Sequence, residues 1–290
     1  MKKRMTMFAA LLLAAGVTAQ EKADTTYWTL EGVAGINLSQ VSLSNWAAGG
    51  DGSMAFDLMF NYSADYKRDR HLWQNRLELA YGLNNTSSNG TRKTNDKIYL
   101  SSTYGYRVAK NLYLSGLLTF NTQFANGYDY SGDEPVFMSQ FMAPGYLSVG
   151  AGLTWTPKRW FTATLAPATW RGTFVTDTRL SDTGAFGVDP GRRLLSEFGG
   201  NLRLEASYEF LPNMTVYSRL DLFSDYLRKP ENVDVRWDVQ LQMKINKWFS
   251  ANLTLNSIYD DDIKIPQKDG VAGPRFQFKE VLGIGLQARF

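Results

Sequence analysis

Apolar and polar residues alternate along this chain over stretches longer than most strands of soluble proteins. From residue 54 to residue 67 every second position is apolar or aromatic, and the positions between them are mostly polar. Residues 233–245 repeat the pattern, with seven apolar positions in register with six polar ones. Successive side chains of a β-strand point to opposite faces, and strands average about 5–6 residues. Alternation over a dozen residues therefore predicts strands that cross a membrane, with one face in lipid and the other in a wet lumen.

Stretches of this kind occur about twelve times, which predicts an all-β fold, an antiparallel up-and-down transmembrane barrel. The expected strands lie near residues 27–41, 52–67, 71–85, 95–108, 112–125, 145–156, 160–170, 197–210, 214–227, 232–246, 248–260 and 276–290. An even number of strands places both ends of the barrel chain on the same side of the membrane, as in single-chain bacterial barrels.

The connections between these strands alternate in length. Short turns are expected at 67–70, 109–111, 157–159, 211–213 and 246–247, and longer loops at 42–51, 86–94, 126–144, 171–196 and 261–275. The segment 228–231 is short where the alternation calls for a long loop. Short periplasmic turns and longer external loops are typical of outer-membrane barrels.

The beginning of the sequence predicts export. Lys2, Lys3 and Arg4 precede an apolar run at 8–17 and small residues up to Ala19, an order typical of a secretory signal peptide. The run is too short for a membrane-spanning helix, which needs about 20 apolar residues. We expect a signal peptide at 1–19, cleavage after Ala19, and a single barrel domain over 20–290 in the outer membrane of a Gram-negative cell.

The final stretch keeps the strand pattern to its last residue. Leu282, Ile284, Leu286, Ala288 and Phe290 share one face. A terminal strand that ends in phenylalanine resembles the signal by which the outer-membrane assembly machinery recognises its clients. The pattern therefore predicts that Phe290 is an assembly signal and that this machinery is a partner during biogenesis.

Three segments carry a resemblance to a known family. The stretch 37–50 (NLSQVSLSNWAAGG), together with 184–188 and 190–191, resembles an uncharacterised Bacteroidetes-type family of outer-membrane barrels. The resemblance covers essentially the whole mature chain and implies the barrel fold and outer-membrane lipid as its surroundings. It carries no catalytic or binding residue to any position of this sequence.

Composition narrows the classes of function. The 31 basic and 28 acidic residues nearly balance, whereas a nucleic-acid partner would require a concentrated basic face. The chain has no cysteine and a single histidine, His71, so the usual pairs of nucleophile and base are not available. Outer-membrane lipid hydrolases place His and Ser two residues apart on the lipid face, but here Trp73 stands two residues after His71. We predict no enzymatic activity, no cofactor and no nucleic-acid partner.

Acidic residues in two predicted loops leave calcium binding as an alternative. Asp260, Asp261 and Asp262 form one acidic run, and Asp129, Asp133 and Glu134 lie in another loop. Oxygen-rich clusters suit Ca²⁺. The spacing matches no calcium-binding loop, however, and charged loops are usually solvated. We therefore predict no metal site.

Charged residues occupy the predicted inner face of the strands, which favours a porin-like channel. Charges are costly in lipid and stable in a wet lumen. The lumen-facing candidates are Arg76, Glu78, Arg203, Glu205, Arg219, Asp221, Arg236 and Asp238, and Lys97 belongs to the same predicted inner face. The hairpin around 211–213 places Glu205 opposite Arg219 and Arg203 opposite Asp221, so these charges are also expected to stabilise the barrel wall.

The loop at 127–145 is too apolar to be freely solvated. Its candidates Phe137, Met138, Phe141 and Met142 predict either a plug inside the lumen or contact with a partner or lipid at the surface. The loop at 171–196, with Arg171, Arg192 and Arg193, is a second candidate for constricting the pore. About twelve strands give a lumen between the filled interior of eight and the open channel of sixteen. We predict a narrow or loop-occluded pore for small polar solutes, and as the alternative a non-conducting barrel that acts as a scaffold or docks partners.

Overall fold

The computed structural model describes residues 27–42, 51–132, 134–265 and 273–290. The predicted signal peptide at 1–19 and its cleavage after Ala19 lie outside the described residues. So do Asp133 and parts of the predicted loops 42–51 and 261–275.

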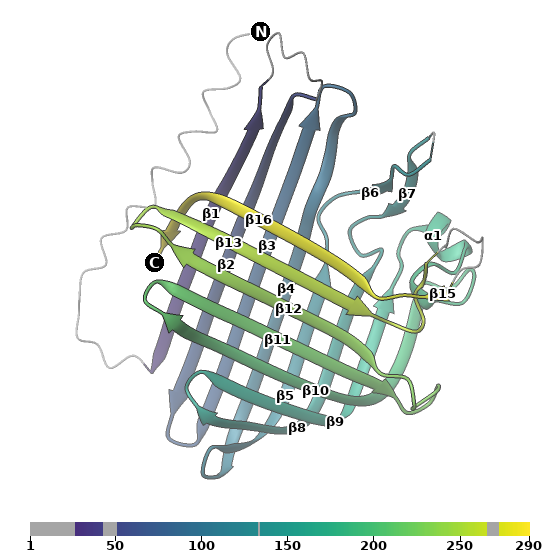
Figure 1. The fold of residues 1–290 in the computed structure, drawn as a ribbon. Helices are drawn as coiled ribbons and strands as arrows, with labels where there is room; N and C mark the ends of the chain where they lie inside the picture. The colour runs from purple at the N-terminus through teal and green to yellow at the C-terminus, as the bar shows by residue number, and fades with distance from the viewer. Residues whose placement is uncertain (1–26, 43–50, 133, 266–272) are drawn as a thin grey trace.

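Twelve antiparallel strands form a closed barrel (Figure 1). They are β1 (Trp28–Val41), β2 (Ser53–Arg68), β3 (His71–Thr86), β4 (Gly90–Ala109), β5 (Leu112–Thr122), β8 (Gly145–Lys158), β9 (Phe161–Phe174), β10 (Leu194–Leu211), β11 (Met214–Asp225), β12 (Asp234–Lys244), β13 (Phe249–Tyr259) and β16 (Gln277–Arg289). Each strand pairs with the next in this series, and β16 pairs with β1. The predicted up-and-down barrel is confirmed.

The strand ends agree with the sequence prediction to within four residues except in one hairpin. A long loop was expected at 86–94, but β3 and β4 continue to Thr86 and Gly90 and leave only a tight turn at 87–89. The prediction was wrong here because the pairing shifts register between Gly82 and Leu83, which breaks the alternation. Beyond that point the hairpin is polar, and its strands are joined by bonds such as the one from Asn85 Nδ2 to Thr91 Oγ1 at 2.7 Å.

The seam between β1 and β16 is completed by Phe290. Its N–H donates to the carbonyl of Gly32 at 3.0 Å, and the N–H of Gly32 donates to the carbonyl of Phe290 at 2.7 Å. The aromatic ring lies directly over Gly32, where a β-carbon would overlap it, and its centroid is 6.2 Å from that of Phe60. The ring and the two backbone bonds thus extend the five residue pairs of this seam.

Two changes at Phe290 distinguish its structural role in the seam between β1 and β16 from its predicted role as an assembly signal. Deleting Phe290 removes both backbone bonds and the ring, whereas Phe290→Ala removes the ring alone. If the assembly machinery recognises the ring, both changes should lower the amount of folded barrel in the outer membrane of cells, and purified Phe290→Ala should still refold in detergent. Heat-modifiable migration on gels measures the folded fraction. A normal yield of both variants in cells would count against the signal.

The outside of the barrel is an apolar band. Exposed side chains alternate along the strands, as in the sets Leu114 and Leu118, Val149 and Leu153, and Leu282, Ile284 and Leu286. Trp73, Trp155, Trp160 and Trp248 are exposed beside the short turns, where an interfacial girdle of aromatic residues is expected. Water-soluble proteins rarely expose contiguous apolar patches of this size, so lipid is the environment that this surface fits.

The long connections build a small cap at one end of the barrel. One contains the hairpin of β6 (Gly127–Asp129) and β7 (Val136–Ser139), and another contains the helix α1 (Thr178–Asp182) and the 3-10 turn η1 (Ala185–Gly187). A third contributes β14 (Lys264–Ile265) and β15 (Gly273–Pro274). No helix in the described part of the chain is long and apolar enough to cross a membrane.

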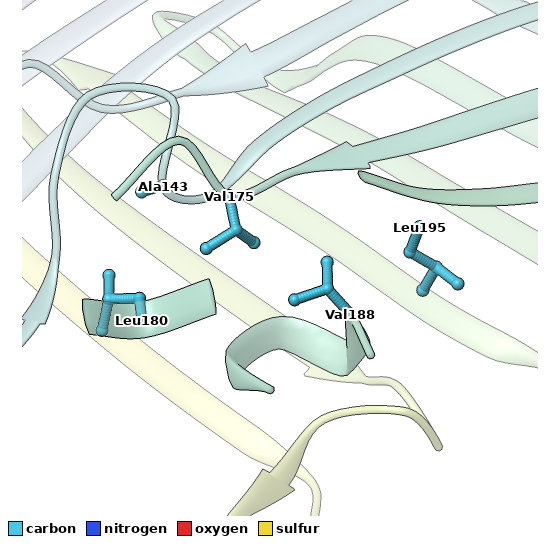
Figure 2. Close-up of a cluster of buried hydrophobic side chains, with 5 residues drawn as sticks. All are labelled: Ala143, Val175, Leu180, Val188 and Leu195. Carbon is cyan, nitrogen blue, oxygen red and sulfur yellow. The ribbon is translucent and has the colours of Figure 1, made fainter. Parts of the chain in front are cut away.

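A cluster of apolar side chains joins two of these connections. Ala143, Val175, Leu180, Val188 and Leu195 are buried together (Figure 2). Phe137 of β7 packs against this cluster. Asp177 caps α1 by accepting from the N–H groups of Arg179 and Leu180, and its hydrogen bond with the Arg179 side chain holds the pKa of Asp177 below its ordinary value. The cluster therefore ties the β6–β7 connection to the connection that carries α1.

Candidate functional site

The centre of the lumen is occupied by Arg219, whose side chain is 2% exposed. Arg219 lies on the inner face of β11, as the alternation predicts. Its Nη1 lies 2.5 Å from Glu78 Oε1 on β3, and its Nη2 binds Asp238 on β12. Five strands separate β11 from β3 in either direction around the barrel. The Arg219–Glu78 pair therefore spans the lumen from one wall to the opposite wall.

Lys97 on β4 extends the same set of ion pairs. Its ammonium lies 2.7 Å from Glu78 Oε2 and 3.5 Å from Asp238 Oδ2. Asp238 also accepts from Nδ2 of Asn256 at 2.6 Å. β4 and β12 are again opposite strands of the barrel. Two cations and two carboxylates from four strands thus meet at one level of the lumen.

A second bridge crosses the lumen beside the first. Arg203 on β10 donates through Nε to Asp221 Oδ1 on β11 at 2.7 Å, and through Nη1 to Ser101 Oγ on β4 at 2.9 Å. We call the set of Glu78, Lys97, Ser101, Arg203, Arg219, Asp221 and Asp238 the mid-lumen network. Removing charges from water is costly unless each is paired and hydrogen-bonded. Every charge of this network has at least one partner of opposite sign within 4 Å.

An aromatic side chain covers the network. The guanidinium carbon of Arg219 lies 3.9 Å from the ring centroid of Tyr99, which is buried on the inner face of β4. A cation over an aromatic face is attracted by the ring quadrupole, and more so where water is excluded. Tyr99 therefore helps to fix Arg219 in the position that bridges the two walls.

Cavities remain on both sides of the network. One of about 350 Å³ lies on the side of the short turns and is lined by residues such as Asp65, Thr215 and Gln242. Another of about 350 Å³ lies toward the long connections, where Asn121 and Gln277 line it. At the level of the network, a cavity of only about 50 Å³ lies beside Glu78 and Lys97. The lumen is thus open at two levels and nearly closed between them.

The predicted lumen residues fall into two groups. Glu78, Arg203, Arg219, Asp221 and Asp238 meet in the mid-lumen network, and the predicted register of Arg203 opposite Asp221 and Glu205 opposite Arg219 is confirmed.

The other three candidates lie outside the network. Arg76 pairs with Asp65 on the neighbouring strand at 3.1 Å, Glu205 accepts from the Tyr217 hydroxyl at 3.0 Å, and Arg236 lies 5.0 Å from the ring centroid of Tyr146.

Two members of the site were absent from the predicted set. Tyr99 and Ser101 share the inner face of β4 with Lys97, so the alternation of that strand contained the signal for their orientation. Their contacts with Arg219 and Arg203 join strands that are far apart in sequence and are not neighbours in the barrel. No local pattern encodes such contacts.

The loop predicted as a plug does not lie in the lumen. Val136, Met138 and Phe141 are exposed at 57%, 46% and 53%, and Figure 1 shows the β6–β7 hairpin standing away from the barrel wall. Phe137 packs against the apolar cluster that includes Val175 and Leu180, and Met142 is half-buried. Of the two locations that the sequence left open for this loop, the described residues occupy the surface.

The loop at 171–196 places one arginine in the barrel and two outside it. Arg171 belongs to β9, where it binds Glu197 on β10 and reaches Asp234 Oδ2 on β12 at 2.5 Å. Arg192 and Arg193 are exposed, and Arg193 donates to Thr178 Oγ1 at 2.9 Å. Only Arg171 therefore narrows the lumen, at the end near the long connections.

The residues considered for chemistry have other contacts. His71 Nδ1 lies 2.6 Å from the Tyr104 hydroxyl, and Asp261 binds Lys229 at 3.0 Å. Among the described residues, no three His, Cys, Asp or Glu side chains are grouped so that they could hold a metal ion. Asp133 is outside that set.

Residues 38–128 match the model of a family described as a protein of unknown function (DUF3078). The match overlaps the segment 37–50 that carries the resemblance to an uncharacterised barrel family, and it specifies no bacterial group. Curated proteins give no sequence match to this chain.

Several solved structures are similar in fold. The COG4313 outer membrane channel from Pseudomonas putida F1 is 12% identical, with a TM-score of 0.40 over 94% of this chain and 98% of that chain. The translocator domain of the autotransporter NalP from Neisseria meningitidis is 12% identical, with a TM-score of 0.37 over 98% and 94%. The NanC porin is 9% identical, with a TM-score of 0.38 over 89% and 99%. The likeness concerns barrel architecture alone.

Proposed function

We propose that this protein is an outer-membrane β-barrel that acts as a narrow pore for passive diffusion of small polar solutes, and that the mid-lumen network keeps the pore closed for most of the time. The observation that carries the proposal is the Arg219–Glu78 pair, which joins opposite walls at 2.5 Å. Ion pairs between side chains of the barrel strands close the lumen in this proposal. They take the role that the sequence indicated for the loop at 127–145.

The cavities on either side of the network favour a pore over a solid wall. Side chains fill barrels of eight strands completely, whereas wider barrels enclose cavities or channels. Here two cavities of about 350 Å³ flank the mid-lumen network, beside which a cavity of only about 50 Å³ remains. A protein that served only as a membrane anchor would gain stability by filling this space. The proposal includes no enzymatic activity, because the charges at the centre of the lumen are paired with one another.

One observation favours the scaffold as a second candidate function. The β6–β7 hairpin presents Tyr128, Val136, Met138 and Phe141 to the surroundings, and each of these side chains is more than 40% exposed. An exposed apolar hairpin beside the mouth of a closed barrel is suited to contact with another molecule. A purely docking role requires no passage through the lumen, so solute permeation distinguishes the two functions.

Swelling of proteoliposomes tests the pore directly. Liposomes that contain the intact protein should swell slowly in isosmotic arabinose, faster than protein-free liposomes, and should not swell measurably in raffinose. The physical reason is that the mid-lumen network leaves only about 50 Å³ of space beside Glu78 and Lys97, so the network must rearrange before even a small sugar passes. Equal rates with and without protein for both sugars would support the scaffold. Fast swelling in raffinose would show that the network does not close the lumen.

A further inference from the structure

The cavity on the short-turn side of the network is built as a chamber. It has a volume of about 350 Å³ and is lined by inward-facing residues of eight strands, from Glu78 at the network to Arg289 near the barrel end. That volume is within the usual range of small-molecule sites, about 300–1,000 Å³. We call this cavity the short-turn chamber.

Neutral polar side chains form two rows on one wall of the chamber. Tyr217, Gln240 and Thr254 are direct cross-strand neighbours on β11, β12 and β13. Thr215, Gln242 and Asn252 form the next row. All six line the chamber. The first row therefore presents two hydroxyl groups and one amide, and the second row presents one hydroxyl group and two amides. Within a row, neighbouring side chains are separated by the distance between adjacent strands.

The facing wall adds a further amide with free hydrogen-bonding capacity. Asn61 on β2 lines the same chamber. Within the described parts of the chain, neither Asn61 nor Gln240 has a side-chain hydrogen bond to protein. Each amide offers two N–H donors and an acceptor oxygen. The two facing walls of the chamber can thus donate hydrogen bonds to a small solute and accept hydrogen bonds from it.

The charges that line the chamber give little net field. Asp65 and Arg76 neutralise each other at 3.1 Å, and Glu78 is bound within the mid-lumen network. Arg289 donates to Gln242, and Glu31 supplies one further carboxylate. An ion of either sign would lose hydration on entry and find no excess of opposite charge. A neutral solute that carries several hydroxyl groups matches both the charge balance and the amide rows.

We propose that the short-turn chamber binds a neutral, polyhydroxylated solute of the size of a mono- or disaccharide. Hydroxyl groups of the solute donate to the amide oxygens of Asn61, Gln240 and Asn252 and accept from their N–H groups, although Asn252 Nδ2 also donates to Ser250 Oγ at 3.2 Å. The inference deepens the proposed function by naming a solute class. Only the passage of the bound solute across the membrane rests on the proposed pore function.

Binding is tested on the full barrel in a detergent without a sugar head group. Maltose serves as the neutral probe, and glutamate and putrescine serve as charged probes, with affinity measured by calorimetry and contact by saturation-transfer NMR. Losing one hydrogen bond between neutral groups weakens binding by about two- to tenfold. The double variant Gln240→Leu/Asn252→Leu, which loses at least two such bonds, should therefore bind maltose about four- to a hundredfold more weakly. Asn121→Leu, in the cavity beyond the network, is the matched control and should bind normally.

Saturable maltose binding that the double variant loses, with glutamate and putrescine not bound, is the expected result. Heat-modifiable migration confirms that the variants are folded. Absence of saturable maltose binding, or equal binding of a charged probe, would overturn the inference. If the barrel binds maltose but liposomes that contain it do not swell, the proposed binding site stands and the proposed pore function is rejected. The two proposals can therefore fail separately.

Discussion

Replacing Arg219 by leucine is expected to lower the free energy of unfolding by about 3–5 kcal/mol. The change leaves one cation, Lys97, for two carboxylates, Glu78 and Asp238, and both carboxylate side chains are less than 10% exposed. Removing one partner of a buried ion pair costs more than the pair contributes, because the remaining charge is left uncompensated. Urea unfolding in lipid vesicles, followed by the fluorescence of the eight tryptophans, measures the difference.

Arg76→Leu is the matched control for this prediction. Arg76 and its partner Asp65 also face the lumen, but their side chains are 30% and 32% exposed. Water can solvate the Asp65 carboxylate when the arginine is removed, so we expect a loss of about 1 kcal/mol or less. Equal destabilisation by the two changes would mean that Arg219 does not occupy a special position in the lumen.

Val239→Arg should destabilise the barrel by about 2–4 kcal/mol, whereas Gln240→Arg, one residue further along β12, should cost far less. Val239 lies on the lipid face beside Asp238, at the level of the mid-lumen network, and Gln240 faces the short-turn chamber. Charge on the lipid face of a barrel is most costly near the middle of the bilayer. The same unfolding measurement in vesicles gives both values. Similar costs for the two substitutions would show that the inner and outer faces of β12 have been assigned incorrectly.

Much of the barrel was predictable from the sequence because its strands meet two different solvents. In β12 the alternation of Val235, Trp237 and Val239 with Arg236 and Asp238 identifies the strand and both of its faces. The hairpin of β10 and β11 also set the register of Arg203 opposite Asp221 through its short turn. In each case the information is local, within one strand or between two strands joined by a tight turn.

The closure of the lumen was not predictable in this way. Arg219 was expected to face inward, but its pairing with Glu78 depends on the tilt of the strands and on the diameter of the closed barrel. These properties determine which residues of β3 and β11 reach each other across the lumen. The alternation gives the inner face of each strand and nothing about the height at which opposite strands meet.

The apolar hairpin shows the same limit. Phe137 and Met138 indicated that the loop must bury apolar area, and composition alone allowed either the lumen or the surface. The choice depends on Val175, Leu180 and Val188, which lie in another connection and provide an apolar surface for Phe137. Contacts between two loops are specified by neither loop alone.

Two double variants isolate the bridge that is held to close the lumen. Glu78→Ala/Arg219→Ala removes the shorter of two ion pairs that span the lumen and leaves the longer one, in which Lys97 and Asp238 neutralise each other at 3.5 Å. Asp65→Ala/Arg76→Ala removes a pair of the same chemistry that lies along one wall, between the adjacent strands β2 and β3. Deletion of residues 130–142 removes the apolar hairpin instead of a pair. Folding of all three is confirmed by heat-modifiable migration.

Single-channel current in planar bilayers then tests the closure. The intact barrel, the Asp65→Ala/Arg76→Ala variant and the hairpin deletion should all show small or rare openings. The Glu78→Ala/Arg219→Ala variant should open more often and for longer, although the Lys97–Asp238 pair and the Arg203–Ser101 bond still cross the lumen. Large, steady currents from the intact barrel would contradict the account, as would a hairpin deletion that opens the pore while loss of the Arg219–Glu78 pair does not.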